Sequence, residues 1–271
     1  MFTVAFIGAG KMAQALAAAM QQAGLLSGVR AVDPVPEAID QLSKRLGNAL
    51  RVEEHPSAAA AAEGADACFL AVKPQDVASA TDDLGETATL IVSIMAGLSL
   101  ASLRERLPNA RLARVMPNTP CLVGQMAAGY TFAPEATDAD RHAVSRMLAA
   151  AGIAIEVAEE QLDAITALSA SGPAFFARLL QWYADAGQRQ GLPADIAIPL
   201  TLQTAVGTAE LLRQLQLDPD SLVEMVSSRG GTTVAGRAVL EASGVAETLA
   251  QTVAAATARS RELGEQSRQS T

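Results

Sequence analysis

Short apolar runs alternate with amphipathic stretches over the first 158 residues of the chain. The apolar runs have the length and composition of buried strands at residues 3–9, 29–33, 65–73, 89–97, 110–117 and 152–158. Helical periodicity separates several of them, most clearly at 11–23, 37–46 and 138–151. Because strands that alternate with helices usually pair in parallel, the pattern predicts a Rossmann-like, doubly wound parallel sheet with helices on both faces.

The strand signal ends near residue 159, and only helical patterns follow. They predict helices at 161–171, 173–190, 194–214, 219–226, 233–242 and 245–266. The segment from Gly191 to Pro193 and the pair Asp218-Pro219 mark helix boundaries. The chain therefore reads as an α/β protein with a sheet domain over 1–158 and an all-α domain over 159–271.

One predicted helix is apolar around most of its circumference. It contains the stretch AIPLTLQTAVGTAELL at residues 197–212. A helix of this kind is buried on several sides, which is more burial than a small helical domain needs for its own core. We expect an obligate dimer formed through the helical domain.

Composition narrows the class of protein. Twenty basic and 29 acidic side chains give a net charge of −9, which argues against nucleic acid or an anionic membrane as a partner. No apolar run approaches the roughly 20 residues of a spanning helix, and Met1 leads directly into a strand without the features of a signal peptide. Cys68 and Cys121 form neither a metal motif nor a disulfide framework. We expect a soluble, cytoplasmic protein without a metal site.

The first strand leads into a dinucleotide-binding loop. Gly8, Gly10 and Ala13 form the pattern G-x-G-x-x-A directly before a helix. Gly8 permits a tight turn, Gly10 lets a pyrophosphate approach the backbone, and Ala13 allows close packing of helix and strand. The N-terminus of the following helix then offers free N–H groups to the phosphates.

Asp33 ends the second strand, where a carboxylate accepts the ribose hydroxyls of NAD and repels a 2′-phosphate. An alternative interpretation is that Asp33 caps the helix that follows it, because DPVPEA is a typical helix start. Arg30 is a candidate for binding a 2′-phosphate. The choice between NADH and NADPH therefore stays open.

The supply of acid–base residues favours a particular hydride acceptor. Reduction of a ketone usually needs a proton donor such as His or Lys, but His55 and His142 lie in surface-type segments and residues 159–271 contain no lysine. The candidates there are hydroxyls, including Ser169, Ser171 and Ser228. An imine nitrogen can already carry its proton, so the composition points to an imine reductase.

The stretch SSRGGTT at residues 227–233 separates two predicted helices. Backbone N–H groups at a new helix N-terminus, with Thr232 and Thr233 beside them, are suited to bind an anion. Gly230 and Gly231 would leave room for close approach of that anion. The alternative interpretation is an ordinary turn between helices, capped by threonine.

Several motifs resemble Δ1-pyrroline-5-carboxylate reductase, in that family's order and over nearly the whole chain. They are FIGAGKMAQAL (6–16), AVKPQ (71–75), VSIMAGL (92–98), RVMPNTP (114–120), TALSASGPAFF (166–176), ADAG (184–187) followed by GL (191–192), QTAVGTAELL (203–212) and SSRGGTT. The resemblance implies NAD(P)H-dependent reduction of pyrroline-5-carboxylate to L-proline, the last step of proline biosynthesis. It also implies dimers of intertwined helical domains, often assembled into decamers.

The resemblance also implies roles for individual residues. Besides Asp33, the cofactor-binding positions are Ile7, Gly8, Ala9, Gly10, Lys11, Met12, Ala71, Val72, Lys73, Pro74, Ala96 and Gly97. The substrate-binding positions are Asn118, Ser171, Ser228, Gly231, Thr232 and Thr233, and Thr233 is the catalytic candidate because it is placed to reach the imine nitrogen.

Three positions depart from the family's usual motifs. Ala170 replaces a glycine, Arg229 replaces a proline and Gln181 replaces a glutamate. These departures leave open a related cyclic imino acid as substrate, or a non-catalytic, nucleotide-sensing relative. A β-hydroxyacid dehydrogenase is a further alternative, but it would use a lysine that residues 161–190 lack.

Overall fold

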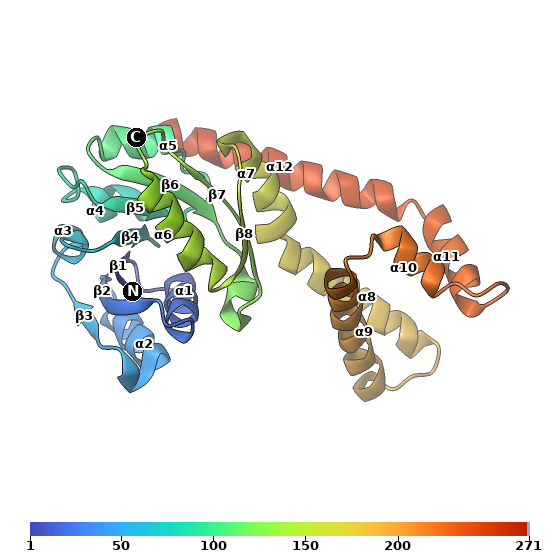
Figure 1. Ribbon diagram of the computed structural model, residues 1–271. Coiled ribbons are helices and arrows are strands. Elements are labelled where there is room, and N and C mark those ends of the chain that lie inside the picture. Colours follow the sequence, from blue (N-terminus) through green and yellow to red (C-terminus); the bar gives the residue numbers. More distant parts are fainter. Residues whose placement is uncertain (270–271) are drawn as a thin grey trace. The chain divides into compact units, whose positions relative to one another are not determined.

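The computed structural model describes residues 1–269 of the chain (Figure 1). Contacts between residues divide it into two compact units. We call residues 1–171, together with those from 254 onward, the sheet unit, and Gly172–Val253 the helical unit.

The described part of the sheet unit forms one eight-stranded sheet in the order β3-β2-β1-β4-β5-β6-β7-β8. Neighbouring strands are parallel except for β6 and β7, which are antiparallel. The strands are β1 (Phe2–Ile7), β2 (Leu26–Val32), β3 (Val52–Glu54), β4 (Ala67–Leu70), β5 (Leu90–Ser93), β6 (Arg111–Met116), β7 (Met126–Phe132) and β8 (Gly152–Glu156).

The predicted doubly wound sheet is confirmed, but two strands, β3 and β7, were missed, and β7 runs together with β8 against the other six. β3 has three residues and is largely exposed, so it carries little apolar signal. β7 begins with Met-Ala-Ala-Gly, which has weak strand propensity. The connection from Met116 to Met126 contains only the short helix η3 (Thr119–Val123), and a parallel return needs a longer crossover. β7 therefore pairs antiparallel with β6, and the prediction of a wholly parallel sheet is wrong at this point.

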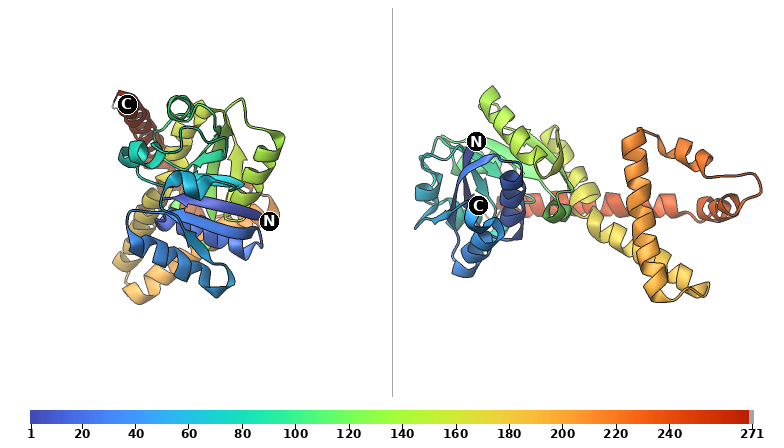
Figure 2. Two further views of the ribbon diagram at one scale, coloured as in Figure 1. Left: turned by 90° about the vertical axis from the view of Figure 1, so that its left-hand side faces the viewer. Right: turned by 60° about the horizontal axis from the view of Figure 1, so that its bottom comes forward.

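Helices cover both faces of the sheet, as the views in Figures 1 and 2 show. Leu16, Leu42 and Met147 belong to the same buried cluster as Phe6, and Val77 and Leu103 belong to a second cluster with the next residue, Ile7. The first face is covered by α1 (Lys11–Gln22), α2 (Pro36–Leu46) and α6 (Asp138–Ala149), the second by α3 (Ala58–Ala62), α4 (Val77–Thr81) and α5 (Leu100–Arg106). Full burial of each such side chain stabilises the fold by about 1.5–3 kcal/mol.

The segment after β8 packs on the sheet. It consists of η4 (Glu159–Gln161), α7 (Leu162–Ile165) and one π-helical turn, η5 (Thr166–Ala170). An ideal Cβ on Gly129 of β7 would lie 2.5 Å from Ile165 Cδ1 and 3.2 Å from Leu162 Cδ2, so α7 lies directly on this strand. Contacts thus group 159–171 with the sheet unit, whereas the predicted helical domain begins at 159. The boundary at 158 stays a prediction about domain organisation.

The helical unit is built from α8 (Gly172–Arg189), α9 (Ala194–Leu215), α10 (Pro219–Met225), α11 (Thr232–Ala242) and the first residues of α12 (Val245–Gln269). α8 and α9 pack against each other (Figure 2), but few of their side chains are buried. Phe176, Trp182 and Val206 are each at least 60% exposed, and α11 buries none of its described side chains. So large an apolar surface is typical of a subunit interface. Among residues 1–269, no helix is long and apolar enough to cross a membrane.

Candidate functional site

The turn after β1 requires glycine at position 8 for a steric reason. Gly8 has a φ of +93°, and its N–H donates to the Val32 carbonyl at 2.9 Å. An ideal Cβ on Gly8 would lie 2.8 Å from the Ala71 carbonyl oxygen. Any side chain would force the ends of β1 and β4 apart. Gly8 makes the tight turn that the sequence predicts.

Helix α1 begins with an open N-terminus. Gly10 is its N-cap residue, its backbone is extended, and no side chain caps the helix. The surroundings of Gly10 are open: apart from its chain neighbours, no described atom lies within 4 Å of an ideal Cβ there. N–H groups in a first helical turn have no intrahelical acceptor, and the positive end of the helix dipole lies beside them. The loop from Ile7 to Met12 therefore fits the pyrophosphate of a dinucleotide.

The other predicted cofactor residues follow neighbouring strands. Ala71, Val72, Lys73 and Pro74 come directly after β4, and Ala96 and Gly97 come shortly after β5. Because β1, β4 and β5 are adjacent and parallel, these segments lie along the same edge of the sheet as the phosphate loop. The Ala71 N–H donates to the Ile7 carbonyl at 2.8 Å, which joins two of them directly.

Asp33 contacts the phosphate loop itself. Its Oδ2 accepts the Ala9 N–H at 2.7 Å and its Oδ1 accepts the Val35 N–H at 2.8 Å. The N-cap residue of α2 is Val35 and no side chain caps that helix, so the interpretation of Asp33 as a helix cap is wrong. The carboxylate thus joins the end of β2 to the start of the phosphate loop.

Arg30, the candidate for binding a 2′-phosphate, makes contacts with neighbouring parts of the sheet unit. It lies in β2, three residues before Asp33, and its guanidinium donates to the Glu63 carbonyl. Its Nε lies 3.7 Å from a carboxylate oxygen of Glu53. These contacts hold Arg30 among β2, β3 and the end of α3.

The stretch 227–233 forms another helix start with a glycine N-cap and no side-chain cap, in the helical unit. Gly231 is the N-cap residue of α11, it is extended, and no side chain caps the helix, so the interpretation as a threonine-capped turn is wrong. By contrast, four helices of the chain have a side-chain cap, supplied by Ser57, Ser99, Thr137 and Asp218. Thr232 and Thr233 are exposed at the open end of α11, where their N–H groups can bind an anion.

The two glycines of this stretch are needed by the turn itself. Gly230 has a φ of +74°, a conformation that favours glycine. The Gly231 N–H donates to the Ser228 carbonyl at 2.9 Å, and an ideal Cβ on Gly231 would lie 2.5 Å from Ser228 Oγ. The geometry of the turn therefore accounts for glycine at both positions, whereas the sequence analysis explained these glycines by room for an anion.

Asn118 and Ser171, the remaining predicted substrate residues, belong to the sheet unit. Asn118 follows β6 and is only 7% exposed, and its amide bonds to Ala127 and Ser169. Ser171 directly follows the π turn, and its N–H donates to the Thr166 carbonyl at 2.9 Å. The sequence predicted one regular helix over 161–171 and missed this π turn.

The three departures from the usual motifs lie in different places. Ala170 is the last residue of the π turn. Gln181 lies on an exposed face of α8, where its Nε2 donates to Asp185 Oδ1 at 2.8 Å. Arg229 is exposed in the turn before α11. None of the three departures removes a backbone N–H group at the start of α1 or of α11.

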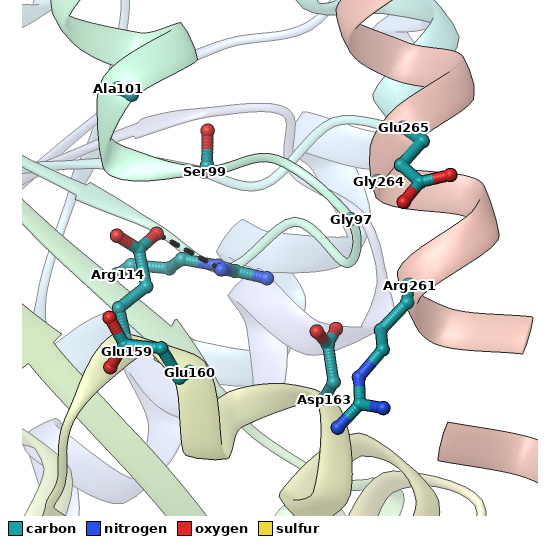
Figure 3. A pocket seen from close by; sticks show the side chains of 10 residues that line it. All are labelled: Gly97, Ser99, Ala101, Arg114, Glu159, Glu160, Asp163, Arg261, Gly264 and Glu265. Atoms are coloured by element: carbon teal, nitrogen blue, oxygen red, sulfur yellow. Dashed lines mark hydrogen bonds and ion pairs between the residues drawn. The ribbon is translucent and has the colours of Figure 1, made fainter. Parts of the chain in front are cut away.

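A cavity of about 460 Å³ adjoins the turn at Gly97 (Figure 3). It is lined by Gly97, Ser99, Ala101, Arg114, Glu159, Glu160, Asp163, Arg261, Gly264 and Glu265. The Arg114 guanidinium lies 3.1 Å from Glu159 Oε1, and the same oxygen accepts the Leu100 N–H at 2.8 Å. Glu159 thus joins β6 to the start of α5. Sequence analysis missed this cavity because segments far apart in the chain form its walls.

The two cysteines are buried and unpaired. Burial raises the pKa of the Cys68 thiol to about 12 and that of Cys121 to about 11. Both thiols stay protonated at neutral pH, so neither is suited to act as a nucleophile.

Two different family models match the chain, one in each part. Residues 159–263 match the family described as pyrroline-5-carboxylate reductase dimerisation, and residues 3–97 match NADP oxidoreductase, coenzyme F420-dependent. The first match identifies the helical region as one of self-association. Among solved structures, a pyrroline-5-carboxylate reductase from Coxiella burnetii aligns with a TM-score of 0.90 at 28% identity, covering 97% of this chain and 98% of that one. One from Plasmodium falciparum, with NADP bound, aligns at 0.82 and 27%, with the same coverage.

Curated relatives agree with the structures. The pyrroline-5-carboxylate reductase of Glycine max is 38% identical over 97% of this chain and 96% of its own length. That of Pseudomonas aeruginosa is 40% identical over 97% of both chains. Identity at this level over nearly the full length confirms the resemblance, and the chain belongs to the pyrroline-5-carboxylate reductase family.

Proposed function

We propose that the chain reduces 1-pyrroline-5-carboxylate to L-proline with NAD(P)H, the last step of proline biosynthesis. The observation that carries this proposal is the pair of open, glycine-started helix N-termini, α1 in the sheet unit and α11 in the helical unit. One suits the pyrophosphate of a dinucleotide, and the other suits the carboxylate of a small substrate. The names of the relatives described above support the same reaction.

The carboxylate seat is formed by the start of α11 in this proposal. The N–H groups of Gly231, Thr232 and Thr233 bind the substrate carboxylate, with Ser228 beside them. The Thr233 hydroxyl oxygen accepts a hydrogen bond from the protonated ring nitrogen and so orients the imine carbon. Ser171 contributes a further hydroxyl to the substrate. Thr233 is catalytic through this contact with the reacting group, and its contribution is mainly orientation.

The cofactor supplies the hydride when it is bound, and the chain supplies its position. We propose that the loop from Ile7 to Met12 holds the pyrophosphate, and that the segments 71–74 and 96–97 line the nicotinamide half. The imine nitrogen already carries a proton when the carbon receives the hydride, so the product is the amine of proline. This balance needs no lysine or histidine donor, which agrees with a helical region that contains none.

We propose that NADH is the preferred cofactor. Asp33 places a carboxylate against the phosphate loop, and Glu37 adds a second negative charge in the first turn of α2. Arg30 is held by Glu63 and Glu53, beside the edge strand β3. A 2′-phosphate would therefore meet negative charge without a cation from residues 33–37.

We propose that the self-associating unit is at least a dimer, formed through the helical unit, with decamers as a further level of assembly. The exposed apolar side chains of α8, α9 and α11 support this, because a solitary subunit would leave them in water.

A net charge of −9 supports a small-molecule enzyme without a nucleic-acid partner. Reduced nicotinamide and free cysteines are both typical of the cytoplasm, where we propose that the enzyme acts.

Substitution of Gly10 by valine should remove cofactor binding without unfolding the protein. The space around Gly10 is open in the protein, so the branched side chain collides with the pyrophosphate alone. We expect the Kd for NAD(P)H, measured by fluorescence titration, to rise roughly 100-fold or more, with Tm unchanged. Gly8→Ala is the control that should instead lower Tm, because its Cβ meets Ala71. Cofactor affinity like that of the wild type in Gly10→Val would remove the site from this loop.

Substitution of Asp33 should shift the cofactor preference toward NADPH. Asp33→Ser removes the charge, and Asp33→Asn removes it while keeping the shape of the side chain. The ratio of kcat/KM for NADPH to that for NADH should rise roughly 10- to 100-fold, as expected for about 1.4–2.7 kcal/mol of relieved repulsion. Glu37→Gln, a neutral change nearby, should have a smaller effect. A strong preference of the wild type for NADPH would show that Asp33 has no such role.

Substitution of Thr233 should reduce turnover of pyrroline-5-carboxylate, followed by nicotinamide absorbance. Thr233→Ala should lower kcat/KM by roughly 10- to 1,000-fold, because about 1.4–4 kcal/mol of orienting contact is lost. Thr233→Ser keeps the hydroxyl and should retain most of the activity, and Kd for NAD(P)H should hardly change in either variant. Gly231→Val should be worse for substrate affinity. If Thr233→Ala and Gly231→Val both keep kcat/KM near the wild-type value, the substrate binds elsewhere, and a wild type without turnover would refute the proposed reaction.

A charge placed on α9 should dissociate the assembly and inactivate it. Val206 is 63% exposed on α9, so Val206→Asp should cost little in the isolated subunit and much in an interface. Val123, 75% exposed in the sheet unit, provides the control Val123→Asp, which should leave the assembly intact. Sedimentation would measure both variants. An active wild-type monomer at working concentration would contradict the proposed dimer.

A further inference from the structure

The side chain of Asn118 is fully used inside the chain. Its Oδ1 accepts the Ala127 N–H at 2.9 Å, and its Nδ2 lies 3.2 Å from both the carbonyl oxygen and the Oγ of Ser169. Ser169 Oγ in turn donates to the Ala127 carbonyl at 2.5 Å. Asn118 as a whole is 7% exposed, and both polar atoms of its amide have partners within the chain. We call these three residues the Asn118 clamp.

The clamp lies at the same sheet edge as the proposed cofactor segments. Asn118 comes just after β6, which is parallel to β5, and Ala127 is at the start of the antiparallel β7. Ser169 is the fourth residue of the π turn that leads to Ser171. The clamp therefore fastens the π turn to the edge along which Ala96 and Gly97 lie.

The sequence of the turn explains why it needs an outside donor. In a regular α-helix the Ser169 carbonyl would accept the N–H of residue 173, but that residue is Pro173 and has no N–H. Asn118 Nδ2 provides a donor for this carbonyl. The π register is closed by the Ser171 N–H, which bonds to the Thr166 carbonyl five residues back. π turns are rare and persist where tertiary contacts support them.

We propose that Asn118 is a positioning residue for the reaction, acting through Ser169 on Ser171, and that it does not touch substrate or cofactor. Residues in an α-helix advance by about 100° each, so replacing the π turn by α-helix would rotate Ser171 by about that angle relative to β7. A hydroxyl turned away by that angle no longer reaches the substrate. This inference rests on the proposed function and deepens it, because it replaces the direct substrate contact implied by the family motif.

The test combines kinetics with an observable that needs no turnover. Asn118→Ala should lower kcat/KM for pyrroline-5-carboxylate by roughly 10- to 100-fold, the range expected for displacement of a positioned group. The Kd for NADH should stay within about twofold of the wild-type value, since no cofactor contact is lost. Amide hydrogen exchange at Ser171 should accelerate by roughly tenfold or more, because opening of the π turn becomes easier.

Two further variants separate positioning from mere loss of stability. Thr137→Ala removes the cap of α6, away from the clamp, and should lower Tm while leaving kcat/KM and exchange at Ser171 unchanged. Adding Ser169→Ala to Asn118→Ala should cause little further loss, because both changes break one network.

Three results would overturn the proposal. The first is a rise of tenfold or more in the Kd for NADH in Asn118→Ala. The second is a loss of kcat/KM in the double variant equal to the product of the losses in Asn118→Ala and Ser169→Ala. The third is unchanged exchange at Ser171 in Asn118→Ala. A wild type that does not turn over pyrroline-5-carboxylate would refute the proposed function, while exchange at Ser171 would still decide whether Asn118 holds the turn.

Discussion

The close approach of the Gly8 turn to the backbone of Ala71 is the constraint on which the sheet unit's site depends. It occurs between β1 and β4, where the strand order reverses and the crossovers leave the sheet toward opposite faces. A crevice at such a point is the usual ligand position in open α/β sheets. Because Gly8 has no side chain, the loop can lie against the end of β4, and the N–H groups at the start of α1 stay open. Asp33, which follows the neighbouring strand β2, then bonds to the loop at Ala9.

The helical unit is governed by a different constraint, its shortage of internal core. Of the large side chains on α8, α9 and α11, many are exposed, and the apolar surface of α9 is not confined to one face. The free energy that keeps these helices ordered must come largely from association, since conformational entropy opposes folding of so thin a unit. The proposed carboxylate seat lies in the same unit. Loss of association would therefore weaken the substrate site along with the fold that presents it.

The two open helix N-termini suggest how a chain with so few acid–base side chains handles two anionic ligands. Backbone N–H groups bind an anion without a titrating side chain, and their geometry is fixed by the helix. Four helices among the described residues have side-chain caps, whereas α1 and α11 each begin with a glycine N-cap and no such cap. Orientation of a protonated imine needs little more than such donors and a few hydroxyls.

The order of the helices and of the strands other than β3 and β7 followed from the sequence alone, because hydrophobic periodicity and the glycine motifs are local properties. The alternation over 1–158 indicated the doubly wound sheet, and G-x-G and SSRGGTT marked both open helix starts. The direction of β7 was not predictable in the same way, since it depends on how far a short connection reaches. The same holds for Asp33, which has helix-start neighbours in sequence but contacts Ala9 in space. Tertiary structure alone turned Asn118 toward Ser169, because the partner that its amide satisfies lies 51 residues away along the chain.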